Sequence, residues 1–373
     1  NGKEYSTEPT FSYKIDNPCR ADLSCIIKNK YGKVEMSTSF SSNHNFSKGF
    51  FYVADGTFNF YDTEKKTAYQ DCYASLNAGK TLGIGNYDSA NIIHSNGKFY
   101  LLVGTSTSNR DHFYIVDAKT LYYENSAVVG ANLSGLTILN EQYGLVTGDG
   151  IRRIDLKSLN NVRIKNERLL CFYNSIIYNG KVLSNDTYKD ESKVKYYDVN
   201  ELIAAKEGEA PAVTELDIIQ KQKINFVLAK DGNVYTLESA DNGCNIVKIK
   251  NDFTLEKVFA NFQPAKGPYH SSPTIGMVAS ETENIIYLVS TDGAIYKYIL
   301  GDSDSLKAPF IAAESGVSIT APLQLNQQSG ELYVTYTEER KDESKIVVYS
   351  KDGKVLHTVD CGESVPSQIL FNN

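Results

Sequence analysis

The sequence lacks the features that would place it across a membrane or on a nucleic acid. No apolar run reaches the roughly 18 to 20 residues that a membrane-crossing helix needs, and the segment Asn1-Gly2-Lys3-Glu4 is polar rather than signal-like. The formal net charge is -7, and the basic residues form no stripe. We therefore expect no nucleic acid partner, because binding a polyanion needs a concentrated basic surface.

Common catalytic and metal-binding motifs are also missing. The sequence has no Gly-x-Ser-x-Gly elbow, no phosphate-binding glycine loop and no His-Glu-x-x-His stretch. The six cysteines, at positions 19, 25, 72, 171, 244 and 361, lack the paired Cys-x-x-Cys spacing of a zinc site. Their number permits disulfides in an oxidising compartment, and free buried thiols are the alternative.

What the sequence does contain is a repeat. A short apolar strand, a tight turn, an aromatic-centred strand, a polar loop, an alternating strand and an Asp followed by a turn recur along the chain. The copy at residues 91–120 shows this order most clearly, with Asn96-Gly97 as its hairpin turn. The second strands of the seven copies lie at residues 50–53, 98–103, 143–146, 181–183, 233–237, 285–289 and 331–334. The third strands follow at residues 58–62, 113–117, 151–155, 194–198, 245–249, 294–298 and 346–349.

This spacing predicts an all-β fold, a seven-bladed β-propeller with four-stranded antiparallel blades. One four-stranded sheet cannot cover both of its faces, so neighbouring copies must stack until the ring closes. We expect residues 1–373 to form a single propeller domain, with the seven blades in residues 43–373. Residues 1–42 contain strand-like stretches at 11–15 and 33–36. They are expected to close the ring by adding an outer strand to the last blade. Residues 199–206 are the one expected helix.

Strand order in such a blade places tight glycine turns on one face of the disc and the long polar loops on the other. A binding site is therefore expected on the loop-rich face. Tyrosines beside small polar residues at the approaches to the central channel suit a large, partly polar ligand. They are equally suited to filling the junctions between blades. The predicted ligand-binding residues are Tyr87, Asp88, Asn109, Arg110, Tyr173, Asn174, Tyr188, Tyr269, His270 and Arg340.

Catalysis has weaker support in the sequence. His270 could act as a base, but a lone exposed histidine is more often a solvated or hydrogen-bonded residue. We expect no catalytic residue, no resident cofactor and no metal ligand, while an axial calcium ion stays open. The enzyme alternative is a lactonase-like or lyase-like propeller whose axial metal is held by carboxylates such as Asp88, Asp149 or Asp292.

Part of the chain resembles a known bacterial group. Residues 323–334, 344–355 and 362–366 resemble the last blade of surface propeller lipoproteins of gut Gram-negative bacteria, and residues 113–120 are similar to the generic repeat. These proteins are related to seven-bladed YVTN-type repeat proteins and stand on the outer membrane beside nutrient importers. Some members capture vitamin B12 for a transporter. No channel loop matches a corrinoid-binding pattern, so B12 is one candidate ligand among several. The absence of tryptophan disfavours Trp-Asp repeat scaffolds and quinone-dependent propeller dehydrogenases.

We therefore expect a non-catalytic ligand-capture protein that binds a nutrient or cofactor for a partner transporter. The resemblance implies an exported protein of the outer-membrane surface or periplasm, touching the membrane only through a lipid anchor that this sequence does not contain. A scaffold for protein–protein interaction is a further alternative.

Overall fold

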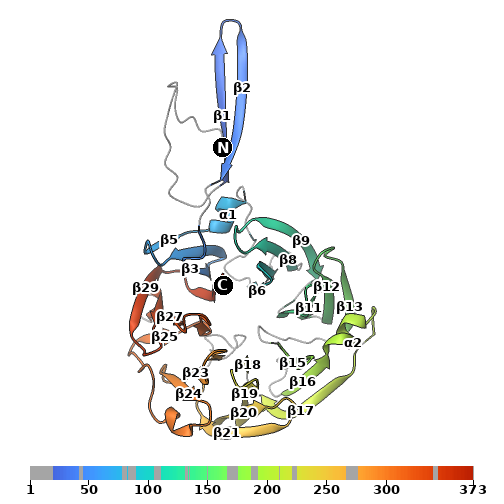
Figure 1. Ribbon diagram of the computed structural model, residues 1–373, viewed down its shortest axis with the longest axis vertical. Coiled ribbons are helices and arrows are strands. Elements are labelled where there is room, and N and C mark those ends of the chain that lie inside the picture. Colours follow the sequence, from blue (N-terminus) through green and yellow to red (C-terminus); the bar gives the residue numbers. More distant parts are fainter. Residues whose placement is uncertain are drawn as a thin grey trace.

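The chain folds into a ring of seven antiparallel sheets around a central axis (Figure 1). The computed structural model describes residues 20–41, 45–77, 82, 90–104, 111–130, 133, 135–148, 150–165, 175–185, 192–209, 211–220, 225–265, 276–338 and 343–372. The predicted seven-bladed β-propeller is confirmed. Each second and third strand expected from the repeat is present, and the two pair with each other in the same blade.

The strands of each blade follow one another from the channel outwards. Blade 1 contains β30 (Pro366–Leu370), β3 (Gly49–Ala54), β4 (Thr57–Asp62) and β5 (Thr67–Tyr69). Blade 2 contains β6 (Ala90–Ser95), β7 (Lys98–Val103), β8 (Asp111–Asp117) and β9 (Tyr123–Gly130). Blade 3 contains β10 (Gly135–Ile138), β11 (Tyr143–Gly148), β12 (Gly150–Asp155) and β13 (Asn161–Lys165). Blade 4 contains β14 (Ile176–Tyr178), β15 (Lys181–Asn185), β16 (Ser192–Asp198) and β17 (Val213–Gln220).

The remaining blades follow the same plan with two variations. Blade 5 contains β18 (Val227–Leu228), β19 (Val234–Ala240), β20 (Gly243–Ile249) and β21 (Leu255–Phe262). Blade 6 contains β22 (Met277–Ala279), β23 (Ile285–Val289) and β24 (Ile295–Ile299). In blade 7, β25 (Val317–Ile319) and β26 (Gln324–Leu325) share the inner position before β27 (Leu332–Glu338), β28 (Glu343–Tyr349) and β29 (Val355–Gly362).

The open edge of β24 in blade 6 is covered by a loop instead of a fourth strand. The backbone of Ile295 exchanges hydrogen bonds with that of Ile311 at 2.9 and 3.0 Å. The Ser305 hydroxyl of the short 3-10 helix η1 (Ser303–Leu306) accepts from the Ile299 N–H at 2.9 Å. These contacts satisfy backbone N–H and C=O groups of the β24 edge that could otherwise pair with a strand of another chain.

The ring is closed by its C-terminal strand, and the described residues 20–41 take no part in closing it. β30 pairs with β3, with Ile369 opposite Tyr52, so the two ends of the ring share blade 1. The outer position of blade 7 is filled by β29. The expectation that residues 1–42 add that strand is therefore wrong for the described part of the segment, and residues 11–15 lie outside it. The physical reason is local pairing: residues 33–36 find their partner across a tight turn.

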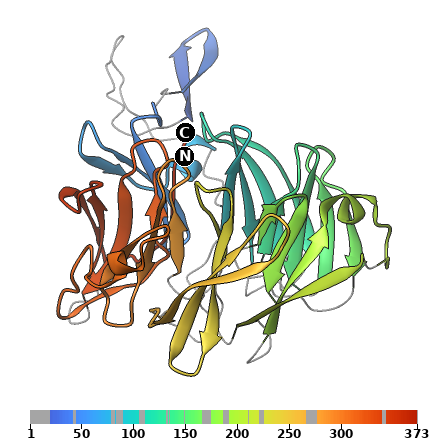
Figure 2. The same ribbon diagram turned by 60° about the horizontal axis from the view of Figure 1, so that its bottom comes forward.

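Residues 20–41 form a hairpin that stands outside the disc (Figures 1 and 2). Its strands, β1 (Arg20–Asn29) and β2 (Gly32–Ser41), pair only with each other, in ten consecutive residue pairs without a register shift.

The apolar core lies between neighbouring blades. Between blades 7 and 1, for example, Phe50, Tyr52 and Ile369 pack against Tyr333 and Ile346, and all five are buried. Such alternation of inward residues on each sheet is what period-two patterning predicts.

The recurrent Asp of the repeat caps the turn between the third and fourth strands. The Asp155 carboxylate accepts the N–H groups of Lys157 at 3.0 Å and Ser158 at 2.7 Å. Asp62, Asp117 and Asp198 each accept the N–H groups two and three residues ahead in the same way. A side chain that satisfies turn donors explains why Asp recurs at this position.

Helices are few in the described residues. The predicted helix at 199–206 is confirmed as α2 (Val199–Ala204), whose first turn Asp198 caps. A second helix, α1 (Cys72–Leu76), was not predicted from the sequence and follows Asp71, which has a left-handed conformation with φ 40°. Within the described chain, no helix has the length and apolar character to span a bilayer. The described cysteines 25, 72, 244 and 361 are free thiols, and positions 19 and 171 lie outside the described residues.

Candidate functional site

The candidate site is the face of the disc where the second and fourth strands of each blade end, which we call the loop face. All ten predicted ligand-binding residues, from Tyr87 to Arg340, lie outside the described residues. Their proposed roles stay predictions. The structure does describe the strand ends from which these loops leave, and those ends set the geometry of the site.

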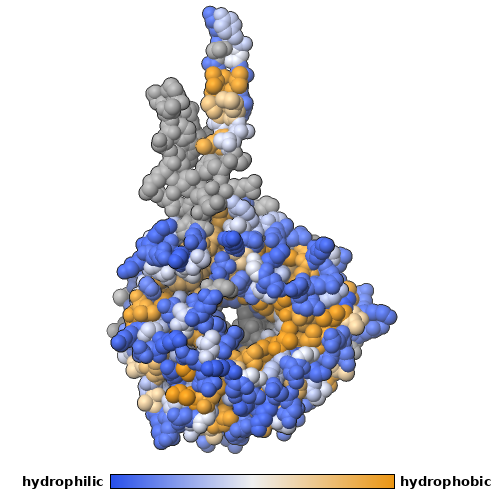
Figure 3. Space-filling view, viewed as in Figure 1, coloured by the Kyte–Doolittle hydropathy of each residue, from blue (hydrophilic) through white to orange (hydrophobic). Residues whose placement is uncertain are grey.

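The disc is hollowed at its centre. Figure 3 shows hydrophobic surface on the wall of the hollow toward β11 and β15, and hydrophilic surface on the side of β25 and β27. A ligand in this channel would therefore meet surfaces of both kinds, which suits a partly polar molecule.

A buried chain of neutral polar side chains joins blades 4 and 5 near the loop face. Asn185, the last residue of β15, donates through Nδ2 to Oε1 of Gln220 at 2.7 Å. Gln220, the last residue of β17, donates through Nε2 to the Thr236 hydroxyl and to the Leu237 carbonyl, both at 3.0 Å. Asn185, Gln220 and Thr236 are 4%, 1% and 0% exposed, so these bonds are shielded from water.

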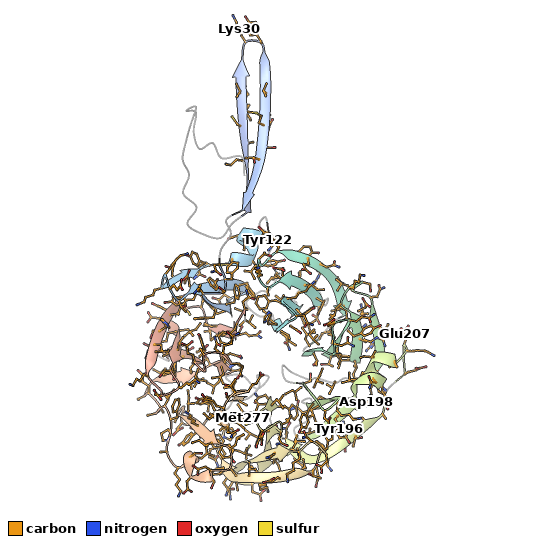
Figure 4. The ribbon with its side chains drawn as sticks, viewed as in Figure 1. Lys30, Tyr122, Tyr196, Asp198, Glu207 and Met277 are labelled. Atoms are coloured by element: carbon orange, nitrogen blue, oxygen red, sulfur yellow. The ribbon has the colours of Figure 1, made fainter. Side chains whose placement is uncertain are left out.

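The chain continues into blade 6 through Asn225. The Thr236 hydroxyl donates to the Asn225 carbonyl at 3.0 Å. The Asn225 amide in turn bonds both backbone groups of Met277, which lies near the channel (Figure 4). Gly276 has φ +73°, and a Cβ there would lie 2.7 Å from the Asn225 Oδ1. Glycine is thus required for this close approach. We call Asn185, Gln220, Thr236, Asn225 and Met277 the polar relay.

The relay ties together the stems of three loop-face segments. Residue 185 precedes the segment 186–191, residue 220 precedes 221–224, and residues 276–277 follow 266–275. Two of these segments contain the predicted contacts Tyr188, Tyr269 and His270.

Other loop-face strand ends also carry hydroxyl groups. Between blades 3 and 4, Thr137 hydrogen-bonds Ser175, while the buried hydroxyls of Thr147 and Ser184 have no hydrogen-bond partner among the described residues. In blade 7, Thr337 hydrogen-bonds Thr320 at 3.1 Å and Ser344 at 3.0 Å. Neutral donors and acceptors are therefore frequent at these stems.

Two carboxylates of the described loop face serve local structure. Asp111 accepts from the Leu133 N–H at 2.5 Å. Asp292, a metal-ligand candidate of the enzyme alternative, accepts from the Ser290 hydroxyl and the Ala294 N–H, and these bonds hold the pKa of its carboxyl below the ordinary value. Asp88 and Asp149 lie outside the described residues. Among the side chains that the structure describes, no group of three or more His, Cys, Asp or Glu could hold a metal ion.

Sequence reasoning missed the polar relay. Asn, Gln and Thr at strand ends form no motif, and their partners lie in other blades. The available signal was the polar residue that interrupts or ends an apolar strand, as Thr236 does within β19 and Gln220 does at the end of β17.

Comparison with solved structures agrees with the architecture. A functionally unknown protein from Desulfotomaculum acetoxidans DSM 771 is 12% identical with a TM-score of 0.55, covering 87% of this chain and 99% of that one. The dihydro-heme d1 dehydrogenase NirN in complex with DHE is 11% identical with a TM-score of 0.52, covering 88% of this chain and 76% of that one. Such low identity shows the fold alone. No curated protein matches the sequence.

The family comparison covers most of the chain. Residues 46–372, which include all seven blades and exclude the hairpin, match a single family. The protein therefore belongs to the family described as "Domain of unknown function (DUF5074)".

Proposed function

We propose that this propeller is a non-catalytic ligand-capture protein that binds a nutrient or cofactor on its loop face. The observation that carries the proposal is the polar relay, which fixes three loop stems across blades 4, 5 and 6. A site whose loop stems are held before the ligand arrives loses less conformational entropy on binding. On the opposite face, the described turns are short and several are closed on their own Asp caps.

The character of the stems suggests the ligand class. Amides and hydroxyls offer neutral donors and acceptors, and part of the channel wall is hydrophobic (Figure 3). Sites for large, partly polar molecules combine an apolar surface with a few placed polar groups. Corrinoids, haem-type compounds, siderophores and oligosaccharides are the proposed candidates. A similarly folded protein is described as a complex with DHE, which supports including haem-type compounds.

The resemblance of the last blade to surface propeller lipoproteins supports the cellular part of the proposal. In this proposal the protein is exported, acts at the outer-membrane surface or in the periplasm, and passes its ligand to a transporter. The loop face is then both the ligand site and the surface presented to that partner.

The test is a thermal-shift screen of the full chain with the four ligand classes. Binding to the folded state raises the midpoint of unfolding by mass action. A hit should be weakened by Tyr188→Ala or Arg340→Ala on the loop face and unchanged by Lys119→Ala, whose turn lies on the opposite face. Failure of all four classes, with a ligand-binding propeller as positive control, would overturn the proposal. So would a hit that the loop-face variants leave unchanged.

A further inference from the structure

The projecting hairpin β1–β2 presents one apolar face that nothing else in the described chain covers. Its register places residues 23, 25 and 27 of β1 opposite residues 38, 36 and 34 of β2, and opposed residues share a face. Ile27, Val34 and Met36 are 53%, 58% and 56% exposed. The apolar face is defined as Leu23, Cys25, Ile27, Val34 and Met36.

An uncovered hairpin of this kind is physically incomplete. A two-stranded sheet is at best marginally stable in water without a third strand or a packing partner. Several exposed apolar side chains on one face mark a site of contact with a protein or a membrane. In the disc, by contrast, apolar sheet faces pack against neighbouring blades, as Phe50 and Tyr52 do against Tyr333 and Ile346.

The charges at the hairpin tip indicate which kind of surface covers it. Lys28 stands directly opposite Lys33, an arrangement of like charges that destabilises a strand pair. Lys33 pairs with Glu35 at 2.8 Å. No described carboxylate lies within ion-pair distance of Lys28 or of Lys30, which occupies the turn (Figure 4). The tip thus carries positive charge that no acidic side chain in the described structure neutralises.

The rest of the chain has the opposite charge. Residues 20–41 contain four basic and two acidic residues in a chain of net charge -7. An anionic surface would therefore attract the hairpin and repel the disc. Tyr31 in the turn is 85% exposed, and the Lys30 Nζ lies 4.9 Å from the centre of its ring. Tyrosine and lysine together are suited to the boundary between lipid and water.

We propose that the hairpin docks on an anionic lipid surface. Its apolar face enters the boundary between head groups and acyl chains, while the tip lysines reach the phosphates, as in other amphipathic interfacial elements. A second copy of the hairpin fits less well. It would bring the same positive charge, and two ten-residue strands offer a small face beside the roughly 800 Å² per partner of a standard stable interface.

The experiment uses the full chain and phosphatidylcholine vesicles, with and without an equal part of phosphatidylglycerol. Because the sequence contains no tryptophan, Tyr31→Trp creates a single fluorescent reporter at the hairpin tip. We expect its emission to shift to the blue with anionic vesicles only, and the shift to weaken with salt. No shift, or the same shift with neutral vesicles, would overturn the proposal.

Variants in the Tyr31→Trp background separate the contribution of the tip lysines to vesicle binding from that of the apolar face. Lys28→Gln and Lys30→Gln should each weaken vesicle binding about fivefold at low salt. Ile27→Asn should reduce it at least roughly tenfold, and Ser24→Asn on the opposite face is the matched control. Vesicle binding can also be measured as the fraction of protein that sediments with the vesicles. If none of these substitutions changes that fraction, the protein binds through the disc and the proposal is overturned. A reversible dimer that Ile27→Asn abolishes, without vesicle binding, would overturn it too and assign the face to a second copy.

Discussion

The side-chain amide of Asn225 pairs with both backbone groups of Met277. Its Nδ2 donates to the Met277 carbonyl at 2.6 Å, and its Oδ1 accepts from the Met277 N–H at 3.0 Å. Asn225 immediately precedes the inner-strand region of blade 5, and Met277 begins the inner strand of blade 6. One amide thus does between two blades what a ladder hydrogen-bond pair does within a sheet, and blade 5 is held to blade 6 at the channel.

Replacing Asn225 by Ala should loosen this junction. Two backbone groups at the start of β22 lose their partner, and leaving such groups unpaired costs about 1–3 kcal/mol. Urea denaturation should show that loss in the free energy of unfolding. The control is Asn284→Ala, an exposed position with no such side-chain bond between blades. Equal stabilities of the two variants would contradict the role given to the Asn225 amide.

The fold was predictable because the strands and turns of each blade have sequence patterns that are local to that blade. The Asn96-Gly97 turn lies between two strands that pair with each other, and Asp117 caps the next turn. Closure of the ring is different in kind. The Ser367 hydroxyl donates to the Val53 carbonyl across a sequence separation of 314 residues. No local pattern in residues 366–370 predicts that these residues pair with β3. The same limit hid the polar relay, because Gln220 and Thr236 acquire their roles only when blades 4 and 5 meet.

Truncating Ile369 should destabilise the whole ring. This side chain is 2% exposed and packs between blades 1 and 7. Removing such a buried aliphatic group typically costs about 2–5 kcal/mol. β30 is the last strand of the chain and lies in the first blade. Ile369→Ala should therefore lower the midpoint of a single cooperative unfolding transition measured by circular dichroism. Val365→Ala, at a side chain 39% exposed just before β30, should have little effect. A separate early transition would argue that closure does not couple the blades.

The described cysteines should differ sharply in reactivity. Burial raises the pKa of Cys72 to about 12, of Cys244 to about 11 and of Cys361 to about 12, whereas Cys25 is exposed on the hairpin. At pH 8 only on the order of one in a thousand of the Cys244 thiols is ionised, and the thiolate is the reacting form. Brief alkylation followed by peptide mass mapping should therefore label Cys25 first. Denaturant should make the four rates similar, and rapid native labelling of Cys72 would contradict its place in the core.

Asp155 should make the turn after β12 sensitive to acid. The N–H of Ser158 foremost, with the Ser158 hydroxyl, the Gln142 amide and the Lys157 N–H, holds the pKa of its carboxyl below the ordinary 3.8. A carboxyl whose folded-state pKa is lowered contributes stability above its unfolded pKa, and that contribution is lost as the pH falls through the folded-state value. The part of the stabilisation that depends on the charge is thus complete at neutral pH and is lost progressively as the pH falls below about 4.

The test compares Asp155→Ala with the wild type across that range. At pH 7 the substitution should lower the free energy of unfolding by about 1 kcal/mol, the usual cost of losing a capping side chain. As the pH falls through the folded-state pKa of Asp155, this difference should shrink to that between Asp155→Asn and Asp155→Ala, because the protonated carboxyl keeps an acceptor oxygen but carries no charge. Asp155→Asn keeps an acceptor oxygen without a charge, so it should lose less stability at pH 7 and show less acid dependence than the wild type. A stability difference between Asp155→Ala and the wild type that stays constant from pH 7 to pH 3 would show that the charge of Asp155 contributes nothing to the turn.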